Sequence, residues 1–124
     1  MSAAPPTIPD ALLPAHYFSS GVYVKQFHLR TVDEEVETHV HTYDHLSLLA
    51  SGTVRVTVDG VATVYTAPTA VTIHAGKVHH IAPLTPDCLW YCVHKIPEEL
   101  LESGNALDSI DTVLIRKVAP DATA

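Results

Sequence analysis

Four histidines have the residue type and the spacing of a metal site. They are His39, His41, His45 and His79, the first three within a stretch of seven residues. Side chains two apart on a β-strand point to the same side, so His39 and His41 can aim two imidazoles at one point. A polar turn at residues 42–44 can bring His45 back toward that point, and a neighbouring strand can add His79. Four neutral nitrogen donors that converge on one centre predict a single divalent transition metal, and imidazole suits iron, nickel, copper, cobalt and zinc.

The length and charge of the chain limit the classes of partner that it can bind. Its 124 residues predict one domain, and its formal charge of −7 comes from 7 basic and 14 acidic residues. A surface that binds nucleic acid or an anionic membrane usually carries the opposite sign. No apolar run approaches the ~20 residues that span a bilayer, and residues 1–9 lack the pattern of a secretory signal. We therefore expect a cytoplasmic protein with a small-molecule substrate and no nucleic-acid or membrane partner.

The two cysteines, Cys88 and Cys92, lie in one apolar run. Residues four apart on a strand share a face but are separated by roughly 13 Å, whereas a disulfide needs Cα atoms closer than about 7 Å. We interpret both as reduced thiols that fill core space, which fits a reducing compartment.

The remaining pattern predicts an all-β protein. Residues 1–18 form a proline-rich N-terminal arm, residues 19–118 form the domain, and residues 119–124 form a tail. A short C-terminal helix is expected only at residues 97–104, where proline opens the first turn and glycine ends it. Short alternating segments separated by turns indicate eight or nine strands of a sandwich or barrel. The expected strands cover residues 22–30, 36–41, 45–50, 53–58, 61–66, 70–74, 78–82, 88–95 and 112–118.

The spacing of the histidines resembles the two sequence motifs of the cupin family over roughly residues 20 to 95. The first motif of that family is His-x-His, three or four residues, an acid, six residues and a glycine. The second is Pro-x-Gly, two residues and a histidine. In this chain the matching positions are His39, His41, His45 and Gly52, then His74, Gly76 and His79.

The resemblance implies a cupin jelly roll, which is a double-stranded β-helix barrel, with one divalent metal held inside by His39, His41, His45 and His79. It also implies a homodimer, because cupins often pair. His45 replaces the acid of the first motif, so a mechanism that uses that glutamate as a base is in doubt. A site of four neutral imidazoles keeps the full metal charge and favours an anionic substrate. The alternative is a site of three histidines in which His45 donates a hydrogen bond from beside the ion.

Two further positions depart from the family pattern. His74 replaces the proline of the second motif, and Asp33 stands where a glycine precedes the first histidine by six residues. His74 can line the cavity and orient a ligand, or it can be an ordinary turn residue. The acids at residues 33–37 are expected to be solvated surface.

Tyr43 and His94 are the candidate catalytic residues. Tyr43 lies between two of the predicted ligands, and a phenol beside a metal can donate a proton to a bound substrate. His94 lies on a late strand where a cupin cavity receives side chains. The alternative for the tyrosine is ordinary packing, as we expect for Phe27 and Trp90 in the core.

These observations favour a metalloenzyme, and by resemblance a dioxygenase-type oxidoreductase whose substrate chelates the metal. A lyase or isomerase that uses the metal only as a Lewis acid is the nearest enzymatic alternative. A cupin that binds or senses a ligand without catalysis is the second alternative.

Overall fold

Two five-stranded antiparallel sheets and one short helix make up the part of the chain that the structure describes. The structure is a computed structural model that describes residues 13–104 and 113–118. The elements in chain order are β1 (Ala15–Ser19), β2 (Val22–Leu29), β3 (Glu34–His39), β4 (His45–Ser51), β5 (Thr53–Val58), β6 (Val61–Thr66), β7 (Thr69–Ile73), β8 (His79–Pro83), β9 (Cys88–Lys95), α1 (Glu98–Glu102) and β10 (Ile115–Lys117).

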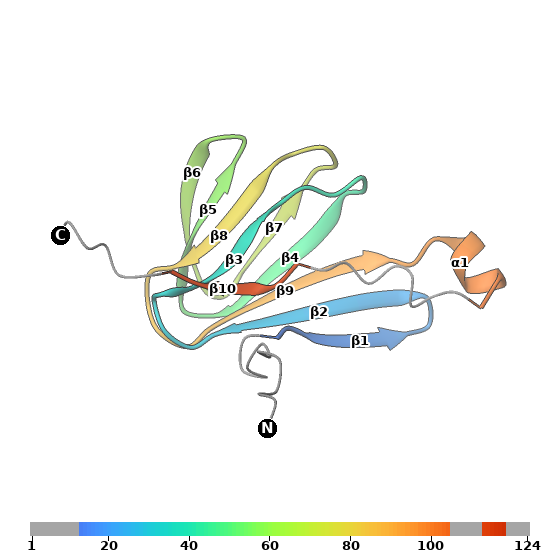
Figure 1. Ribbon diagram of the computed structural model, residues 1–124, viewed down its shortest axis with the longest axis horizontal. Helices are drawn as coiled ribbons and strands as arrows, with labels where there is room; N and C mark the ends of the chain where they lie inside the picture. Colours follow the sequence, from blue (N-terminus) through green and yellow to red (C-terminus); the bar gives the residue numbers. More distant parts are fainter. Residues whose placement is uncertain (1–12, 105–112, 119–124) are drawn as a thin grey trace, which may run out of the picture.

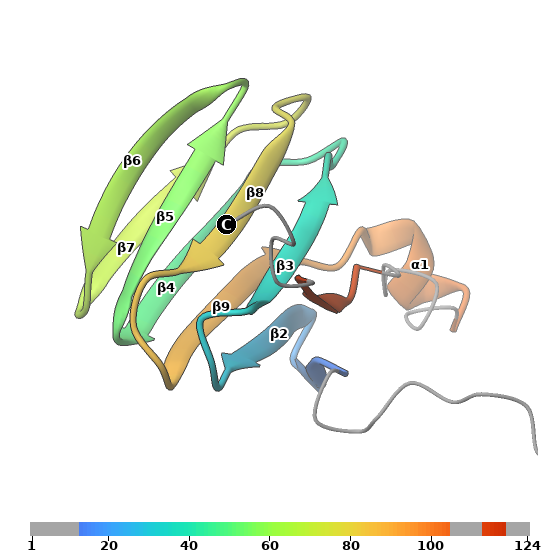
Figure 2. The ribbon, with the colours of Figure 1, turned by 60° about the vertical axis from the view of Figure 1, so that its left-hand side comes forward.

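The sheets face each other and enclose the core between them. One sheet has the strand order β1-β2-β9-β4-β7 and the other the order β10-β3-β8-β5-β6. In Figure 2 the strands β6, β5, β8 and β3 of one sheet lie in front of the strands β7, β4, β9 and β2 of the other, and Figure 1 shows the same strands from another direction. Because strands adjacent in the sequence are often placed in opposite sheets, residues far apart in the chain meet inside the barrel.

The predicted all-β fold is confirmed, and most strands lie within two residues of their expected positions. Strand β1 was not expected: it comes from the end of the proline-rich arm and pairs with β2. An edge strand tolerates a preceding proline because one side of it needs no hydrogen-bond partner. Residues 1–12 of the arm and the predicted tail at 119–124 lie outside the described residues.

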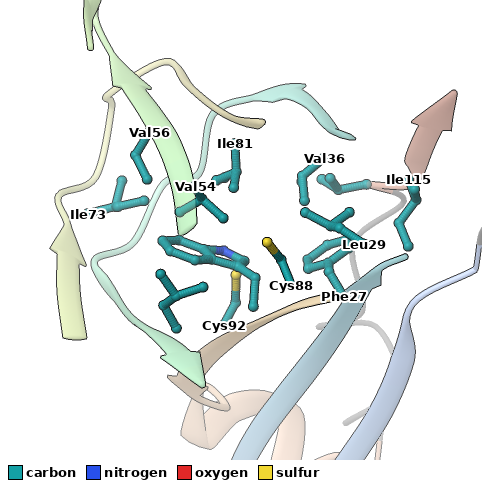
Figure 3. Close-up of a cluster of buried hydrophobic side chains, with 13 residues drawn as sticks. Phe27, Leu29, Val36, Val54, Val56, Ile73, Ile81, Cys88, Cys92 and Ile115 are labelled. Atoms are coloured by element: carbon teal, nitrogen blue, oxygen red, sulfur yellow. The ribbon is translucent and has the colours of Figure 1, made fainter. Parts of the chain in front are cut away.

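The core lies between the inner faces of the two sheets. Figure 3 shows its side chains, contributed by strands of both sheets. Phe27 and Trp90 are fully buried there, as predicted. Cys88 and Cys92 are both buried free thiols, which confirms the predicted reduced state. Among the described residues, no helix has the length and apolar character that crossing a membrane requires.

The acidic segment at residues 33–37 corrects one expectation. Glu34 is only 1% exposed and its carboxylate accepts a hydrogen bond from Arg30 Nε at 2.9 Å. The prediction of a fully solvated acidic surface was therefore wrong at this residue. The alternation of β3 points Glu34 to the same inner side as Val36, and the guanidinium compensates the charge that this position buries.

Candidate metal centre

Three of the four predicted ligands converge on one point. Each of His39, His41 and His79 offers a ring nitrogen, and these three nitrogens all lie within 4.8 Å of one another. The ring centres of His39 and His79 are 3.9 Å apart, and those of His39 and His41 are 4.7 Å apart. Such a group of imidazoles could hold a divalent metal ion.

A β-bulge aims His39 into the barrel. Val36 pairs with Ile81 and His39 pairs with His79, so β3 has one residue more than β8 between these pairs. Strict alternation would turn His39 away from the buried side of Val36. The extra residue resets the alternation, as bulges commonly do beside functional sites.

His41 reaches the site from a loop rather than from a strand. The predicted strand was expected to continue to His41, but β3 ends at His39. The backbone N–H of Gly76 donates to the carbonyl of His41 at 2.8 Å, and that of Ala75 donates to Asp44 Oδ1 at 2.7 Å. The loops β3–β4 and β7–β8 therefore lie side by side at one end of the barrel (Figures 1 and 2).

His45 lies next to the three clustered histidines. It is the first residue of β4, is 4% exposed, and its ring centre is 5.0 Å from that of His41 and 5.3 Å from that of His79. Within the described residues, neither ring nitrogen of His45 has a hydrogen-bond partner. A buried polar atom without a hydrogen-bond partner costs free energy, so a ligand bound to this imidazole would stabilise it.

Backbone hydrogen bonds set the tautomers of His39 and His79. The Nδ1–H of His39 donates to the carbonyl of Glu37 at 2.7 Å, and the Nδ1–H of His79 donates to the carbonyl of Lys77 at 2.9 Å. A carbonyl only accepts, so the proton is on Nδ1 and the lone pair is on Nε2 of each ring. This is the arrangement that metal-binding histidines use.

Burial keeps these imidazoles in the neutral form that binds metals. It lowers the pKa of His39 to about 4, and those of His41 and His45 to about 3, with the neighbouring histidines adding to the effect. Burial also lowers the pKa of His79. At neutral pH their lone pairs are thus not protonated.

Tyr43 and His94 lie together beside the cluster. The Tyr43 ring stacks on His41 at 4.8 Å and on His94 at 4.3 Å between ring centres. Burial raises the pKa of Tyr43 to about 12, so it keeps its phenolic proton. His94 Nδ1–H donates to the carbonyl of Lys95 at 3.2 Å, and its Nε2 is buried with no partner in the described part of the chain. Tyr43 can therefore donate a proton beside the cluster, and His94 can accept one.

Two other histidines are placed away from the cluster. The side chain of His74 is 69% exposed, and its Nδ1 lies 3.6 Å from Asp44 Oδ2, so it does not line the cavity. His80 Nε2 lies 2.9 Å from Glu35 Oε2, on the opposite side of β8 from His79. Of the two alternatives for His74, a cavity residue or an ordinary turn residue, its exposure supports the turn residue.

Sequence reasoning missed Lys25, which is buried on the inner face of β2. The signal was available in the alternation of this strand, which places Lys25 on the same side as Tyr23 and Phe27. Ser47 and Cys92 are also buried, and Lys25 pairs with Cys92 while Cys92 pairs with Ser47. A polar row therefore lies next to the histidines inside the barrel.

The donor set fits a transition metal. Imidazole nitrogens bind such an ion at about 2.1 Å, which places neighbouring ligand atoms about 3 to 4 Å apart. The ligand nitrogens of the three clustered histidines all lie within 4.8 Å of one another, which is close to that spacing. Within the described residues, His79 Nε2 and both ring nitrogens of His45 are buried without a hydrogen-bond partner, and a bound ion would supply one.

Comparisons with known proteins support the fold. No family model and no curated protein match the sequence. A cupin superfamily protein from Desulfitobacterium hafniense DCB-2 is similar in structure, with a TM-score of 0.59 at 18% identity over 74% of this chain and 84% of that one. KdgF from Halomonas sp. matches with a TM-score of 0.60 at 13% identity over 71% of this chain and 81% of that one. A cupin protein from Bacteroides fragilis matches with a TM-score of 0.58 at 17% identity, over 77% and 86% of the two chains.

These likenesses support the arrangement of the two facing sheets, and the histidine cluster is an observation on this chain itself. The chain has the jelly-roll fold of the cupin superfamily and carries a possible histidine metal site inside it.

Proposed function

We propose that this protein is a mononuclear metalloenzyme that acts on a small chelating or anionic organic molecule, with dioxygenase-type chemistry. The convergence of the nitrogens of His39, His41 and His79 supports it most directly. In this proposal His45 is the fourth ligand, because both of its ring nitrogens are buried without a partner in the part of the chain that the structure describes. A bound divalent ion would polarise and orient a chelating substrate and, where it is iron, copper or nickel, promote the reaction of that substrate with oxygen.

The residues beside the ion supply proton transfer. Tyr43 holds its proton and is fixed between two imidazole rings, so its hydroxyl is suited to donate to an oxygen atom of the substrate. His94 presents an Nε2 lone pair that is shielded from solvent, so it is suited to accept a proton from the substrate. We infer that Tyr43 donates protons and His94 removes them. This division replaces the glutamate of the first cupin motif, whose position His45 occupies in this chain.

The test combines metal analysis with oxygen uptake. The protein is expressed in metal-rich medium and its metal content is measured by elemental mass spectrometry, with the exposed His74→Ala variant as the control for His41→Ala. We expect about one ion per chain in the wild type and in His74→Ala, and little in His41→Ala. Oxygen uptake is then measured with β-dicarbonyls, flavonols and short carboxylates.

The outcomes separate the candidate functions. A wild-type protein without bound metal contradicts the proposal as a whole. A metal-loaded protein that consumes no oxygen with any of these compounds contradicts the dioxygenase part, and leaves a lyase, an isomerase or a ligand-binding protein.

The homodimer and the cytoplasmic location remain predictions from the sequence. Sedimentation equilibrium of the full chain tests the first, with a mass of about twice that of one chain as the expected result.

A further inference from the structure

Tyr23 is a buried phenol with no part in the proton transfers proposed above. It lies on the inner face of β2, is 0% exposed, and pairs with His94 of β9. Its hydroxyl oxygen lies 2.6 Å from Nδ1 of His16, which is the distance of a short hydrogen bond. A buried hydroxyl needs an acceptor, so we assign the proton of this bond to Tyr23 and the lone pair to His16 Nδ1.

His16 connects this phenol to solvent. It is an exposed residue of β1, the edge strand beside β2, and its ring stacks on that of Tyr23 with 5.8 Å between centres. Partial burial is the main cause that lowers the pKa of His16, so its ring is neutral at neutral pH. His16 can therefore accept the proton of Tyr23 and later exchange it with water.

A continuous column of aromatic rings joins Tyr23 to the clustered histidines. The ring of Tyr43 stacks on that of His41 with 4.8 Å between centres, and on that of His94 with 4.3 Å. The ring of His94 meets that of Tyr23 edge to face, with 4.8 Å between centres. These are distances of direct ring contact. The column therefore runs from a predicted metal ligand to the buried phenol and needs no cavity between its ends.

The contacts within this column suit the passage of an electron rather than a proton. A proton moves between groups that lie within hydrogen-bond reach. His94 Nδ1–H donates to the carbonyl of Lys95, and His94 Nε2 is buried without a hydrogen-bond partner in the described part of the chain. An electron needs only the contact between the rings.

The hydrogen bond to His16 lies at the outer end of the column, where it is useful to an oxidised tyrosine. A phenol that loses an electron becomes a strong acid, so tyrosine is oxidised readily only when a base takes its proton at the same time. His16 Nδ1 is in place to do so, at 2.6 Å from the Tyr23 oxygen.

We propose that Tyr23 and His16 form a redox-active pair that gives the protein a further activity, the reduction of peroxide at the metal site. Hydrogen peroxide accepts two electrons as its O–O bond breaks and, with two protons from solvent, gives two water molecules. One electron comes from bound iron(II), and the other comes from Tyr23 through His94 and Tyr43. The proton of Tyr23 moves to His16 Nδ1, which leaves a neutral tyrosyl radical.

The pair is restored from the surface. A small reductant such as ascorbate returns one electron to Tyr23, and His16 returns the proton. The inference rests on the metal site of the proposed function but not on its reaction with oxygen. It adds that an oxidising equivalent formed beside the ligand histidines is carried away from them to β1.

The test follows the radical in iron-loaded protein. The full chain is loaded with iron(II) in the absence of oxygen, mixed with hydrogen peroxide and frozen rapidly, and electron paramagnetic resonance measures the tyrosyl radical. We expect a tyrosyl signal in the wild type and its loss in Tyr23→Phe, which keeps the ring and removes only the hydroxyl. Tyr17→Phe is the matched control and should keep the signal, because Tyr17 is an exposed residue of β1.

His16→Phe tests the proton acceptor. It keeps a ring at this position and removes the nitrogen that accepts the hydrogen bond. The radical should form about 100-fold more slowly, the lower end of what a positioned base contributes to a reaction. Stopped-flow absorbance of the tyrosyl radical measures the rate. The iron content of every variant should equal that of the wild type, and circular dichroism confirms that each is folded.

Each outcome supports or overturns the inference. An iron-loaded wild type without a tyrosyl signal overturns it without any variant, so the test holds even if Tyr23→Phe does not fold. A signal that persists in folded Tyr23→Phe overturns it, because the radical then lies on another tyrosine. An unchanged rate in His16→Phe overturns the role of His16. A wild type that binds no iron contradicts the proposed metal site and this inference with it, and that result is read from the iron content before peroxide is added.

Discussion

The rings of His39 and His79 face each other across β3 and β8 with their centres 3.9 Å apart, and both donate their Nδ1 proton to the backbone carbonyl two residues earlier. The same kind of local hydrogen bond thus orients both rings, one on β3 and one on β8. Each presents Nε2 to the interior before any ion arrives. Such pre-orientation reduces the ordering that metal binding must impose.

Removing one of these rings is expected to abolish tight metal binding. Removing a residue that only hydrogen-bonds to a metal ligand typically lowers the metal affinity about 10- to 100-fold. His39→Ala and His79→Ala each remove a ligand itself, so each should lower the affinity for zinc by more than this. Competition with a chromogenic chelator measures the affinity. His74→Ala is the matched control, because this exposed histidine lies five residues before His79. Equal losses in all three variants would contradict the assignment.

His45 decides whether the site has three or four imidazole ligands. Its ring is buried, and neither nitrogen has a partner among residues 13–104 and 113–118. If it is a ligand, His45→Ala should lower the number of nitrogen neighbours of bound cobalt or copper by one. X-ray absorption spectroscopy of the loaded wild type and variant gives this number. An unchanged count would assign His45 to a position beside the ion.

The free energy of unfolding of the metal-free protein should fall in mild acid. The pKa values of His39, His41 and His45 are lowered from 6.5 to about 4, 3 and 3. Below about pH 6.5 the unfolded chain therefore takes up protons that the folded chain does not, so stability decreases as pH falls toward 4. Urea unfolding at a series of pH values measures the slope. His45→Gln should make it shallower, and a flat profile in the wild type would refute the burial of these rings.

Gly52, which matches the glycine of the first motif, should be intolerant of a side chain. Its φ is +85°, and a Cβ atom there would lie 2.4 Å from Cys88 Sγ. Gly60 has a similar φ of +82° but open space around it, so Gly60→Ala measures the backbone cost alone, about 1–2 kcal/mol. Gly52→Ala should lower the free energy of unfolding by more than this in urea denaturation. Equal effects would show that the contact with Cys88 relaxes easily.

The ion pair between the half-exposed Arg30 and the buried Glu34 gives a further test of the fold. Arg30→Met should destabilise the protein by about 2–4 kcal/mol, because it leaves the Glu34 carboxylate buried without its guanidinium. We place the loss toward the lower end of that range because Arg30 is half exposed and water can replace part of its interaction. Thermal and urea unfolding measure the loss. The double variant with Glu34→Met should recover much of it, and a double variant no more stable than Arg30→Met would refute this explanation.

The sequence by itself determined the strands and the residues that could bind a metal. Both follow from local geometry, because alternation within a strand and the type of a turn depend on residues a few positions apart. The strands expected at residues 53–58 and 61–66, which are β5 and β6, and the histidines around the β3–β4 loop were predicted for this reason. The helix was also placed correctly, since proline and glycine mark its ends.

Only the tertiary structure decided how the side chains face the interior. The bulge that turns His39 inward exists because β3 pairs with β8, some forty residues later in the chain. The burial of Glu34 and Lys25 likewise depends on which strands cover them. The contact between His94 and Tyr43 depends on the position of β9 between β2 and β4 in the sheet. Register and burial are set by contacts between distant segments, and the alternation of a single strand does not state which of its two faces will meet another sheet.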